Sequence, residues 1–231
     1  MSFWNIIKED LSQPKVQDPA YRCCVELVFN YPGVWAIVNY RFTHFLWEKK
    51  WHNTARVLAG ISNFLTRVDL HPAAKIGRRV FIDHATGVVI GETTVIGNDC
   101  LIYQGVTFGG VSLDKGKRHP TLEDGVVVGA GAKILGNITI GKGSKIGANS
   151  VVVKDVGANC TAVGVPARAV GGCAQPFEHN KLPDITKEMI GYLIKKLEIL
   201  EKEVAKSNNN IIKPDIELDE LYKQYIKSIK E

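Results

Sequence analysis

An aspartate and a histidine fifteen positions apart, Asp69 and His84, are the first residues of this chain that could do chemistry together. A carboxylate beside an imidazole fixes the tautomer of the ring and stabilises the imidazolium, which makes the histidine a general base. One turn of the repeat described below takes about eighteen residues, or three hexapeptides. The two side chains can therefore meet across neighbouring turns, and a purely structural pairing in a corner is the alternative.

Further polar residues could complete a binding site around His84. Asp83 adds a second carboxylate beside it, and Arg118 and His119 lie in the only strongly polar run of the repeat region. A carboxylate suits an ammonium group, and an arginine binds a carboxylate through paired hydrogen bonds. Together with a base, these groups suit a small amino acid. We interpret the remaining histidine of the region, His71, as structural.

A repeat of six residues must position these groups. From Leu70 to Val152 an apolar residue, often followed by glycine, recurs at six-residue spacing. Helices have a period of 3.6 and ordinary strands a period of 2, whereas a period of six is typical of a parallel β-helix. Each hexapeptide supplies one short strand and one corner. Because one coil cannot bury its own core, the coils must stack.

The repeat is broken twice, and each break contains a histidine. The first break, around His84, admits two extra residues. The second lies between Phe108 and Leu122, which are fourteen positions apart instead of twelve, and it contains the polar run 114–120. This run predicts a loop extruded from a corner. Local departures from a pattern occur preferentially at functional sites, so both breaks favour a site there.

Helices are predicted on both sides of the repeat. Asp18 followed by Pro19 is a helix-start signal, with aspartate as N-cap and proline at the first helical position. The helices predicted before the repeat span about 2–11, 18–31, 34–51 and 54–66. After it, spacings of three and four form an a/d seam of about two heptads, which could pack on the β-helix or pair with copies of itself. The seam consists of Ile190, Leu193, Leu197, Leu200 and Val204.

We therefore predict an α+β fold with three domains. An N-terminal helical domain covers residues 1–67, a β-helix covers 68–172, and a C-terminal connector with a helical extension covers 173–231.

The composition is that of a cytoplasmic protein that contacts neither membrane nor nucleic acid. The net charge of +5 is scattered, which suits a polyanionic small molecule better than a nucleic acid. Five cysteines without a CxxC pair argue against a disulfide framework or a zinc knuckle. Glu9 and Asp10 exclude a signal peptide at the start. The apolar stretch 34–47 contains Arg41 and His44, so it predicts a buried helix and not a membrane span.

Several motifs together resemble the serine O-acetyltransferases, a family of hexapeptide-repeat acyltransferases. The resemblance spans roughly residues 18–170, and its most specific part is Asp-His-Ala-Thr-Gly at 83–87 with Arg-His-Pro at 118–120. Lys117 belongs to the same matching motif, 117–120, and the other matching motifs lie at 68–77, 88–93, 104–110, 129–136 and 164–168.

The resemblance implies transfer of an acetyl group from acetyl-CoA to the hydroxyl of L-serine, giving O-acetyl-L-serine for cysteine biosynthesis, without a metal. His84 would take the hydroxyl proton, with Asp69 as its partner, while the oxygen attacks the thioester directly. The resemblance assigns serine binding to Asp18, Asp83, Arg118 and His119. It assigns coenzyme A binding to Gly110, Ala130 and Arg168.

The same resemblance implies a left-handed coil, homotrimers with sites between subunits, and L-cysteine as feedback inhibitor at the serine site. The helical region before the repeat is shorter than in the family members that form hexamers, which favours a trimer. The charged end at Lys230 and Glu231 lacks the terminal isoleucine of members that bind O-acetylserine sulfhydrylase, which argues against that complex. The C-terminal seam is an addition to the family pattern, and we interpret it as a coiled coil that stabilises the trimer.

Three other functions fit parts of the pattern. An acetyltransferase for another hydroxyl would share the fold and His84, but would give the two carboxylates and Arg118 no common purpose. A hydratase of the γ-carbonic anhydrase type needs three metal-binding histidines, and no third one is convincingly placed beside His84 and His119. A non-enzymatic scaffold would not need polar breaks in its repeat.

Overall fold

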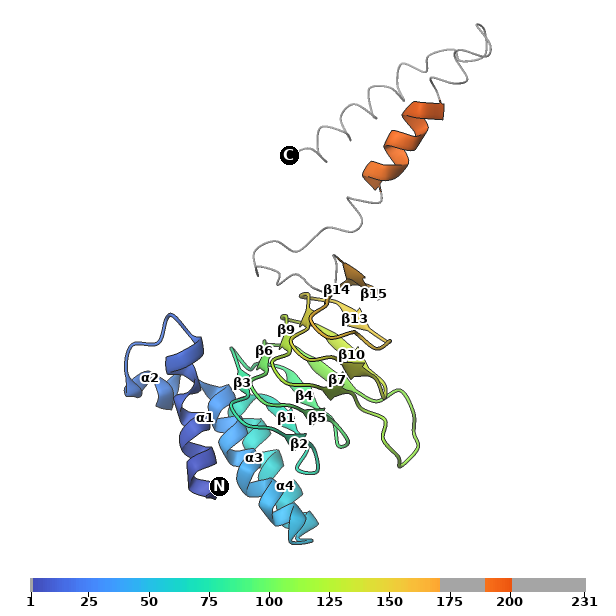
Figure 1. Ribbon diagram of the computed structural model, residues 1–231. Coiled ribbons are helices and arrows are strands. Elements are labelled where there is room, and N and C mark those ends of the chain that lie inside the picture. Colours follow the sequence, from blue (N-terminus) through green and yellow to red (C-terminus); the bar gives the residue numbers. More distant parts are fainter. Residues whose placement is uncertain (1, 171–189, 201–231) are drawn as a thin grey trace, which may run out of the picture. The chain divides into compact units, whose positions relative to one another are not determined.

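The computed structural model describes residues 2–170 and 190–200. The chain divides into two compact units, Met1–Leu182 and Pro183–Glu231, and each is taken by itself. In the first unit, helices at the N-terminal end precede a stack of short strands (Figure 1). This confirms the predicted order of a helical region followed by a β-helix.

Four helices open the described chain. They are α1 (Phe3–Gln17), α2 (Cys24–Phe29), α3 (Pro32–Glu48) and α4 (His52–Thr66). The predicted second helix is wrong at its start, because Asp18 is the C-cap of α1 and α2 begins only at Cys24. The Asp18 side chain accepts the N–H of Ala20 at 2.8 Å. Aspartate before proline therefore forms a turn here, a role that suits this pair as well as an N-cap does.

Fifteen short strands follow within the described residues. They are β1 (Val68–Leu70), β2 (Lys75–Ile76), β3 (Phe81–Ile82), β4 (Val88–Ile90), β5 (Val95–Ile96), β6 (Leu101–Ile102), β7 (Thr107–Gly109), β8 (Thr121–Leu122), β9 (Val127–Val128), β10 (Lys133–Leu135), β11 (Thr139–Ile140), β12 (Lys145–Ile146), β13 (Val151–Val152), β14 (Thr161–Gly164) and β15 (Ala167–Val170).

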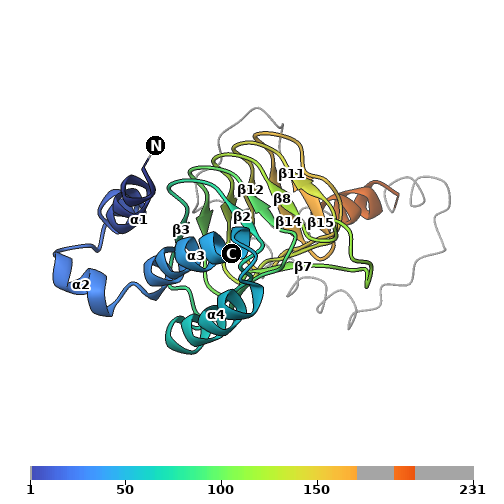
Figure 2. The same cartoon turned by 90° about the horizontal axis from the view of Figure 1, so that it is seen from below.

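The strands form three sheets, and strands β1 to β13 go in turn to sheets A, B and C. Sheet A has the order β1-β4-β7-β10-β13, and sheet B has the order β11-β8-β5-β2. Sheet C contains β3, β6, β9, β12 and β14 in parallel, with β15 antiparallel to β14 at its end. The chain thus winds around a three-sided prism of about five turns. Figure 2 shows the coils and the helices from below. The six-residue period correctly predicted this parallel β-helix.

Two corners of the prism border sheet A. The CA edge, where the chain passes from sheet C to sheet A, consists of segments 83–87, 103–106, 129–132 and 147–150. The AB edge, where it passes from sheet A to sheet B, consists of segments 71–74, 91–94, 110–120 and 136–138. Sheet A separates the two edges along its whole height.

The repeating apolar residues fill the prism. Ile90, Phe108, Ile134 and Val152 lie in register on successive strands of sheet A, and each is at most 1% exposed. Aligned aliphatic side chains of this kind bury a continuous core that no single coil could form.

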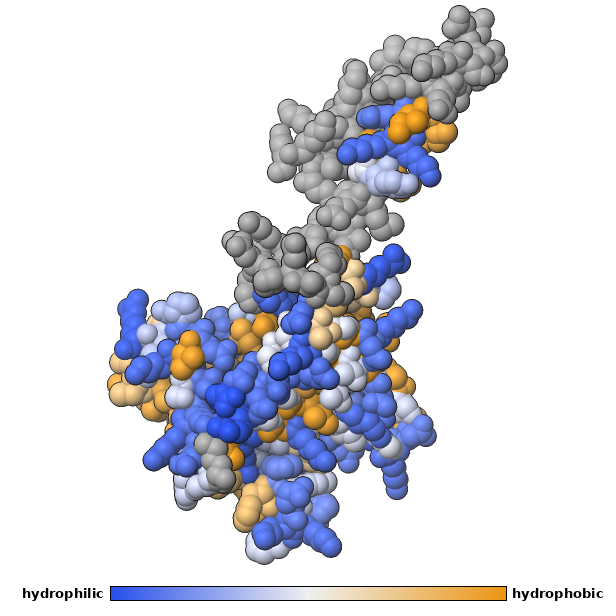
Figure 3. Space-filling model, in the orientation of Figure 1, coloured by the Kyte–Doolittle hydropathy of each residue, from blue (hydrophilic) through white to orange (hydrophobic). Residues whose placement is uncertain are grey.

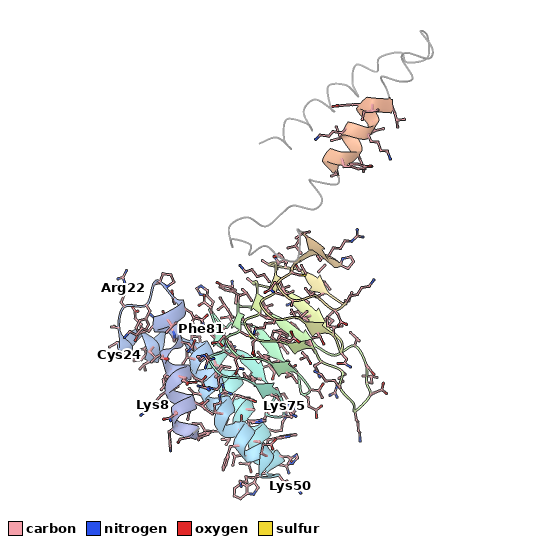
Figure 4. The ribbon with its side chains drawn as sticks, viewed as in Figure 1. Lys8, Arg22, Cys24, Lys50, Lys75 and Phe81 are labelled. Carbon is pink, nitrogen blue, oxygen red and sulfur yellow. The ribbon has the colours of Figure 1, made fainter. Side chains whose placement is uncertain are left out.

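The helices cover the end of the prism that the first coil forms. Ala36 and Ile37 of α3 belong to the same buried core, and the Tyr40 hydroxyl donates to the Ala74 carbonyl at 2.6 Å. Phe81 of the first coil packs among residues from α1 and α3, and Figure 4 labels it at this boundary. A Cβ on Gly33 would lie 2.0 Å from the Ile82 carbonyl oxygen, so this approach of helix to coil requires glycine.

The two breaks of the repeat are both corners, as predicted, but the second was divided wrongly. Leu70 pairs with Ile90 twenty positions on, and Ile90 pairs with Phe108 eighteen positions on. Phe108 then pairs with Ile134, twenty-six positions on. All eight additional residues therefore lie in one corner, as the loop 110–120 that projects from the stack (Figure 1). A spacing of fourteen fits one hexapeptide plus eight residues as well as two hexapeptides plus two.

The second unit is described for residues 190–200, which are helical. Leu193, Leu197 and Leu200 of the predicted seam are each more than half exposed. No described residue packs over these apolar side chains. Val204, the last residue of that seam, lies outside the described range.

The surface and the cysteines add two observations. On the face in Figure 3 hydrophilic residues dominate, with apolar patches near α2. None of the helices in the described part of the chain is both long and apolar enough to span a bilayer. Cys23, Cys24 and Cys100 are free, whereas Cys160 is disulfide-bonded. The odd number of cysteines gave no indication of this bond.

Candidate active site

His84 lies at the CA edge of the first coil, in the corner that contains the extra residues. Its backbone has φ 57°, and Ala85 follows with φ 55°. Left-handed backbone is uncommon for residues other than glycine, and such positions cluster at active sites. The His84 side chain is 73% exposed, and its Nε2 lies 4.0 Å from an Asp83 oxygen. The corner thus presents an accessible imidazole beside a carboxylate.

The turn after α1 brings a second carboxylate to this corner. The Tyr31 hydroxyl donates to Asp18 at 2.6 Å, and this bond is the main reason that the pKa of Asp18 lies below its usual value. His84 lowers the pKa of Asp18 further. The pKa of Tyr103 is raised mainly by burial, and the charges of Asp83 and Asp18 raise it further. We call Asp18, Tyr31, Asp83, His84 and Tyr103 the His84 cluster. It offers two anionic groups and one free imidazole.

Asp69, the predicted partner of His84, lies in the middle strand position of β1. It is aligned with Val89 and exposed on the outer face of sheet A. Within the described residues no hydrogen bond or ion pair joins it to His84, so the structure does not bring the predicted pair into contact. Asp69 acts electrostatically on His71, two positions along the chain.

A second group of polar residues follows the AB edge through three coils. His71 lies in the first coil, Glu92 and Thr93 in the second, and Arg118 and His119 at the end of the projecting loop in the third. We call these five residues the His119 cluster. Arg118 Nη2 donates to Glu92 at 2.5 Å, which holds the pKa of that carboxyl below its usual value.

His119 is buried against the corner of the coil below. Its side chain packs directly on Gly91, where a Cβ would lie 2.0 Å from the ring. Thr93 contacts the Nδ1 atom through its backbone N–H at 3.2 Å and its hydroxyl at 2.9 Å. Burial, followed by the charges of Arg118 and Lys117, lowers the pKa of His119. These surroundings therefore disfavour the charged form of His119.

Lys117 fixes the end of the projecting loop. Its ammonium donates to the carbonyl oxygens of Thr93 at 2.7 Å, His119 at 2.6 Å and Pro120 at 3.1 Å. An ammonium has three protons to donate, so all three are used inside the fold. Lys117 thereby holds the backbone on both sides of His119.

The predicted site residues fall into two groups on opposite edges of sheet A. Asp18, Asp83 and His84 meet at the CA edge, and Arg118 and His119 meet at the AB edge. One edge can supply a base and carboxylates for an ammonium, and the other an arginine for a carboxylate and a neutral imidazole. A single prism does not bring these functions together.

The residues predicted to bind coenzyme A are also separated. Gly110 begins the projecting loop at the AB edge, and Ala130 lies at the CA edge. Arg168 is exposed on β15, where it is paired with Val163. No cluster of three or more potential metal ligands occurs among the described residues.

Sequence reasoning missed five residues of the two clusters and their surroundings, namely Tyr31, Glu92, Thr93, Tyr103 and Lys117. Glu92, Thr93 and Lys117 stand inside motifs that carried the family resemblance, so attention to their polar side chains could have found them. Tyr31 gave no signal, because its contact with Asp18 depends on how α2 and α3 are placed.

Comparison with known proteins gives a consistent result. The family model described as bacterial transferase hexapeptide (six repeats) matches residues 119–154. The serine acetyltransferase of Synechococcus elongatus is 47% identical over 195 residues, covering 83% of this chain and 80% of the relative. That of Bacillus pumilus is 45% identical over 207 residues, covering 88% of this chain and 95% of the relative.

Three solved structures are similar to this chain, each over 73% of its length. Serine acetyltransferase of Neisseria gonorrhoeae in complex with serine is 43% identical, with a TM-score of 0.70 over 69% of that chain. A serine acetyltransferase in complex with cysteine is 47% identical, with a TM-score of 0.71 over 70% of that chain. The Brucella abortus enzyme in complex with coenzyme A is 43% identical, with a TM-score of 0.70 over 68% of that chain.

Proposed function

This chain belongs to the serine acetyltransferase family, an acyltransferase family of hexapeptide-repeat proteins, and from that premise we propose how its residues perform the reaction. The acetyl group of acetyl-CoA passes to the hydroxyl oxygen of L-serine, giving O-acetyl-L-serine. The oxygen attacks the thioester carbonyl directly, and coenzyme A leaves as its thiol. The observation that supports this most is the accessible imidazole of His84, which lies beside Asp83 and acts electrostatically on Asp18.

His84 is the general base of the proposal. A free serine hydroxyl is a poor nucleophile, and a positioned base that removes its proton as the bond forms accelerates such reactions by about 10²–10⁴-fold. His84 is the exposed histidine of the two clusters and has an uncovered ring. The proton that it takes from serine can pass to the departing thiolate.

Asp69 is proposed to assist His84. Its carboxylate is exposed on sheet A and makes no hydrogen bond with the described residues, so it is free to pair with an imidazolium that forms during the reaction. Such a carboxylate orients the ring and stabilises its charged form.

The remaining groups hold the substrate. Asp18 and Asp83 accept hydrogen bonds from the serine ammonium in this proposal, which their nearness to His84 supports. Arg118 is proposed to bind the serine carboxylate through its two guanidinium N–H donors, for which it would leave or share Glu92. Gly110, Ala130 and Arg168 are proposed to contact coenzyme A, which a related enzyme binds.

Two copies of the chain are proposed to build one site. The His84 cluster and the His119 cluster lie on opposite edges of sheet A, so a complete site needs the CA edge of one copy beside the AB edge of the next. A closed ring of three copies satisfies this requirement three times, and cyclic assemblies of identical chains are common. We therefore propose a homotrimer.

L-cysteine is proposed to inhibit at the same site. It has the ammonium and carboxylate of serine and differs in one atom, and a related enzyme has been solved with cysteine bound. The exposed leucines of the 190–200 helix support a coiled coil between copies. If deleting residues 186–231 leaves the trimer and its melting temperature unchanged, that coiled coil is excluded.

Release of coenzyme A from acetyl-CoA with and without L-serine tests the reaction. Wild-type release should require serine, and His84→Ala should lower kcat/KM by about 10²–10⁴-fold, the range expected for a general base. Asp69→Asn should lower kcat with a smaller change in KM. His52→Ala, a change at an exposed histidine of α4, is the matched control and should keep full activity.

Each other result has a defined meaning. Folded trimers that release coenzyme A with another hydroxyl compound but not with serine would contradict the substrate. Serine-dependent release that survives His84→Ala would contradict the assignment of the base and leave the reaction standing.

A further inference from the structure

We propose that Thr93 is a positioning residue that holds His119 as a neutral imidazole with its proton on Nε2, so that His119 offers the substrate a hydrogen-bond donor and not a second base. The inference rests on the proposed function, in which His119 contacts serine. It concerns how the ring of His119 is kept in a single protonation state.

The backbone of Thr93 determines which ring nitrogen of His119 is unprotonated. The Thr93 N–H points at Nδ1 with a nitrogen–nitrogen distance of 3.2 Å. A backbone amide nitrogen can only donate, so Nδ1 must be the acceptor. In a neutral imidazole one nitrogen accepts and the other carries the proton. The proton of His119 is therefore on Nε2.

The hydroxyl of Thr93 leads to the same assignment. Its oxygen accepts the backbone N–H groups of Arg118 and His119, each at 3.1 Å. The hydroxyl proton must then point away from these two donors, and Nδ1 of His119 lies 2.9 Å from the oxygen. Two protons from Thr93 thus converge on Nδ1, and every hydrogen-bonding group of this residue's side chain is used.

The charges around His119 oppose a second proton on the ring. A protonated Nδ1 would face two donors, and the cations of Arg118 and Lys117 stand nearby. Burial and these two charges lower the pKa of His119, and only Glu92 acts in the other direction. The neutral form is therefore maintained by the geometry at Nδ1 and by the surrounding charges together.

The opposite nitrogen is left for a ligand. No described residue forms a hydrogen bond with Nε2 of His119, which lies over Gly91. A Cβ at that position would be 2.1 Å from Nε2, so the glycine leaves the ring its place. A serine oxygen, or the carbonyl oxygen that gains charge during attack, can accept this proton, a type of stabilisation that lowers the barrier of acyl transfer.

This arrangement separates the roles of the two histidines. His84 is 73% exposed and has only a 4.0 Å ion-pair contact to Asp83, so its ring is accessible to a substrate hydroxyl. His119 is 8% exposed, and Thr93 fixes its acceptor nitrogen. One ring is suited to take a proton and the other to donate a hydrogen bond without giving up its proton.

Nitrogen-15 NMR of the histidine rings in the ligand-free, full-length chain tests the proposal directly. Comparison with His119→Asn identifies the His119 signals. In the wild type, Nδ1 should be unprotonated and Nε2 protonated at neutral pH, and this pattern should persist below pH of about 6.5, the ordinary pKa of histidine. A wild-type ring with its proton on Nδ1, or doubly protonated near neutral pH, would overturn the proposal.

Three threonine variants separate positioning from general packing. Thr93→Val removes the hydroxyl, which leaves the N–H groups of Arg118 and His119 without an acceptor. The His119 signals should then titrate closer to the ordinary pKa, and kcat/KM for serine should fall by about 10²-fold, as expected for a displaced contact. Thr93→Ser keeps the hydroxyl and should restore both properties. Thr94→Val is the matched control, because the Thr94 hydroxyl is buried and has no partner among the described residues.

The outcomes distinguish this inference from the proposed function. A Thr93→Val chain whose His119 signals and titration match those of the wild type would overturn the role of the Thr93 hydroxyl, even if serine is acetylated. A wild-type chain with the predicted tautomer that does not acetylate serine would instead contradict the proposed function. If Thr93→Val does not fold, the wild-type spectrum and the Thr93→Ser titration still decide the tautomer.

Discussion

Three histidines lie near sheet A, and their surroundings give them different chemistry. Nδ1 of His71 accepts the Ala73 N–H at 3.0 Å, and the ring packs edge-on against Trp47. His119 is enclosed by Thr93, while His84 is open to solvent. An enclosed ring with an occupied acceptor keeps one tautomer, whereas an open ring can exchange protons. All three residues are histidines, so the differences in their chemistry follow from the contacts that each ring makes.

The sequence predicted part of this. The breaks in the repeat identified the segments of His84 and His119, and His71 was interpreted as structural. The neutral state of His119 could not be predicted, because Thr93 stands twenty-six positions away and meets it only after the loop 110–120 folds back. Likewise, the hydroxyl of Tyr31 reaches Asp18 only once the turn between α1 and α2 has formed.

Replacing Gly91 by alanine should displace His119. The added Cβ would lie 2.0 Å from the imidazole, which no side chain tolerates, so the ring must move away. We expect kcat/KM for serine to fall by about 10²-fold, the size of effect that a misplacement of about 1 Å can have. Steady-state kinetics with serine and acetyl-CoA measure it.

Gly60→Ala is the control for the previous substitution. Nothing lies within 4 Å of a Cβ at this position of α4. Alanine there should raise the free energy of unfolding by about 0.5–1 kcal/mol, because glycine is a poor residue inside a helix. Its activity should match that of the wild type. Full activity of Gly91→Ala would contradict the placement of His119.

The stability of the protein should fall as the pH drops below about 6.5, the ordinary histidine pKa. Burial is the first cause that lowers the pKa of both His71 and His119 in the folded state. In this range the unfolded chain therefore binds more protons than the folded one, so the free energy of unfolding rises with pH. The carboxyls with lowered pKa, such as Asp18, add a separate loss at more acidic pH.

Urea unfolding between pH 5 and pH 8 measures this dependence, a range of about 1.5 units on either side of the ordinary histidine pKa. His119→Asn should make the curve flatter, because one of the two groups no longer binds a proton on unfolding. His52→Asn, at an exposed position of α4, should leave the slope unchanged. An equal slope in wild type and His119→Asn would show that His119 is not held neutral by the fold.

At the scale of elements, the helices set the position of the first coil. Arg41 of α3 forms an ion pair with Asp10 of α1 at 2.9 Å. The same guanidinium donates to the carbonyls of Ile76 and Gly77, both at 2.7 Å. Helix α1 is thereby connected through α3 to the prism, which fixes the turn that places Asp18 beside His84.

The elements whose apolar residues follow a regular period were predicted well, whereas the turns that interrupt this period were not. The hexapeptide spacing predicted the coils, because each apolar position must point into the prism. Helices α3 and α4 were also predicted close to their observed bounds. The start of α2 and the division of the second break were wrong, since both depend on how the chain turns between elements, where several spacings are equally consistent with the pattern.

Replacing Arg41 by methionine should strongly destabilise the first unit. Burial raises the pKa of Asp10, and its bond to Arg41 counteracts this effect. Without the arginine, a buried carboxyl and two carbonyl groups lose their partner, and breaking a buried ion pair costs about 3–5 kcal/mol. Chemical denaturation should show a loss of that size.

Arg79→Met is the matched control, because its ion pair with Asp99 is partly exposed to solvent. Ion pairs of that kind contribute little, so its unfolding curve should nearly coincide with that of the wild type. If both variants lose the same free energy of unfolding, the buried contacts of Arg41 do not stabilise the protein more than an exposed ion pair does.

At the scale of the whole molecule, the prism separates the two halves of the proposed site. The corner of His84 and the corner of His119 border sheet A on its two sides. A three-sided prism cannot fold one edge onto another, since the core between them is filled with buried side chains. The proposed site, which combines motifs from both corners, therefore requires two copies of the chain.

Mixed assemblies test this conclusion. A chain with His84→Ala keeps an intact AB edge, and a chain with Arg118→Ala keeps an intact CA edge. If each site is built from two copies, an interface that joins the two intact edges restores one complete site. Random mixing of equal amounts should therefore recover about a quarter of the wild-type activity, since both edges of an interface must be intact. Coexpression with two affinity tags isolates the mixed trimers, which should retain about a third of the wild-type activity, because one of their three interfaces is complete.

A pairing within one edge supplies the control. Chains with His84→Ala and Asp83→Asn both damage the CA edge, so no arrangement of them yields a complete site, and their mixture should stay inactive. Recovery in that control would mean that subunit exchange or residual activity explains the first result. Mixed assemblies of His84→Ala and Arg118→Ala that remain inactive, although their mass shows both chains, would place the whole site within one copy. The two edges of sheet A would then have separate functions, and Arg118 would have to act on something other than the serine that His84 activates.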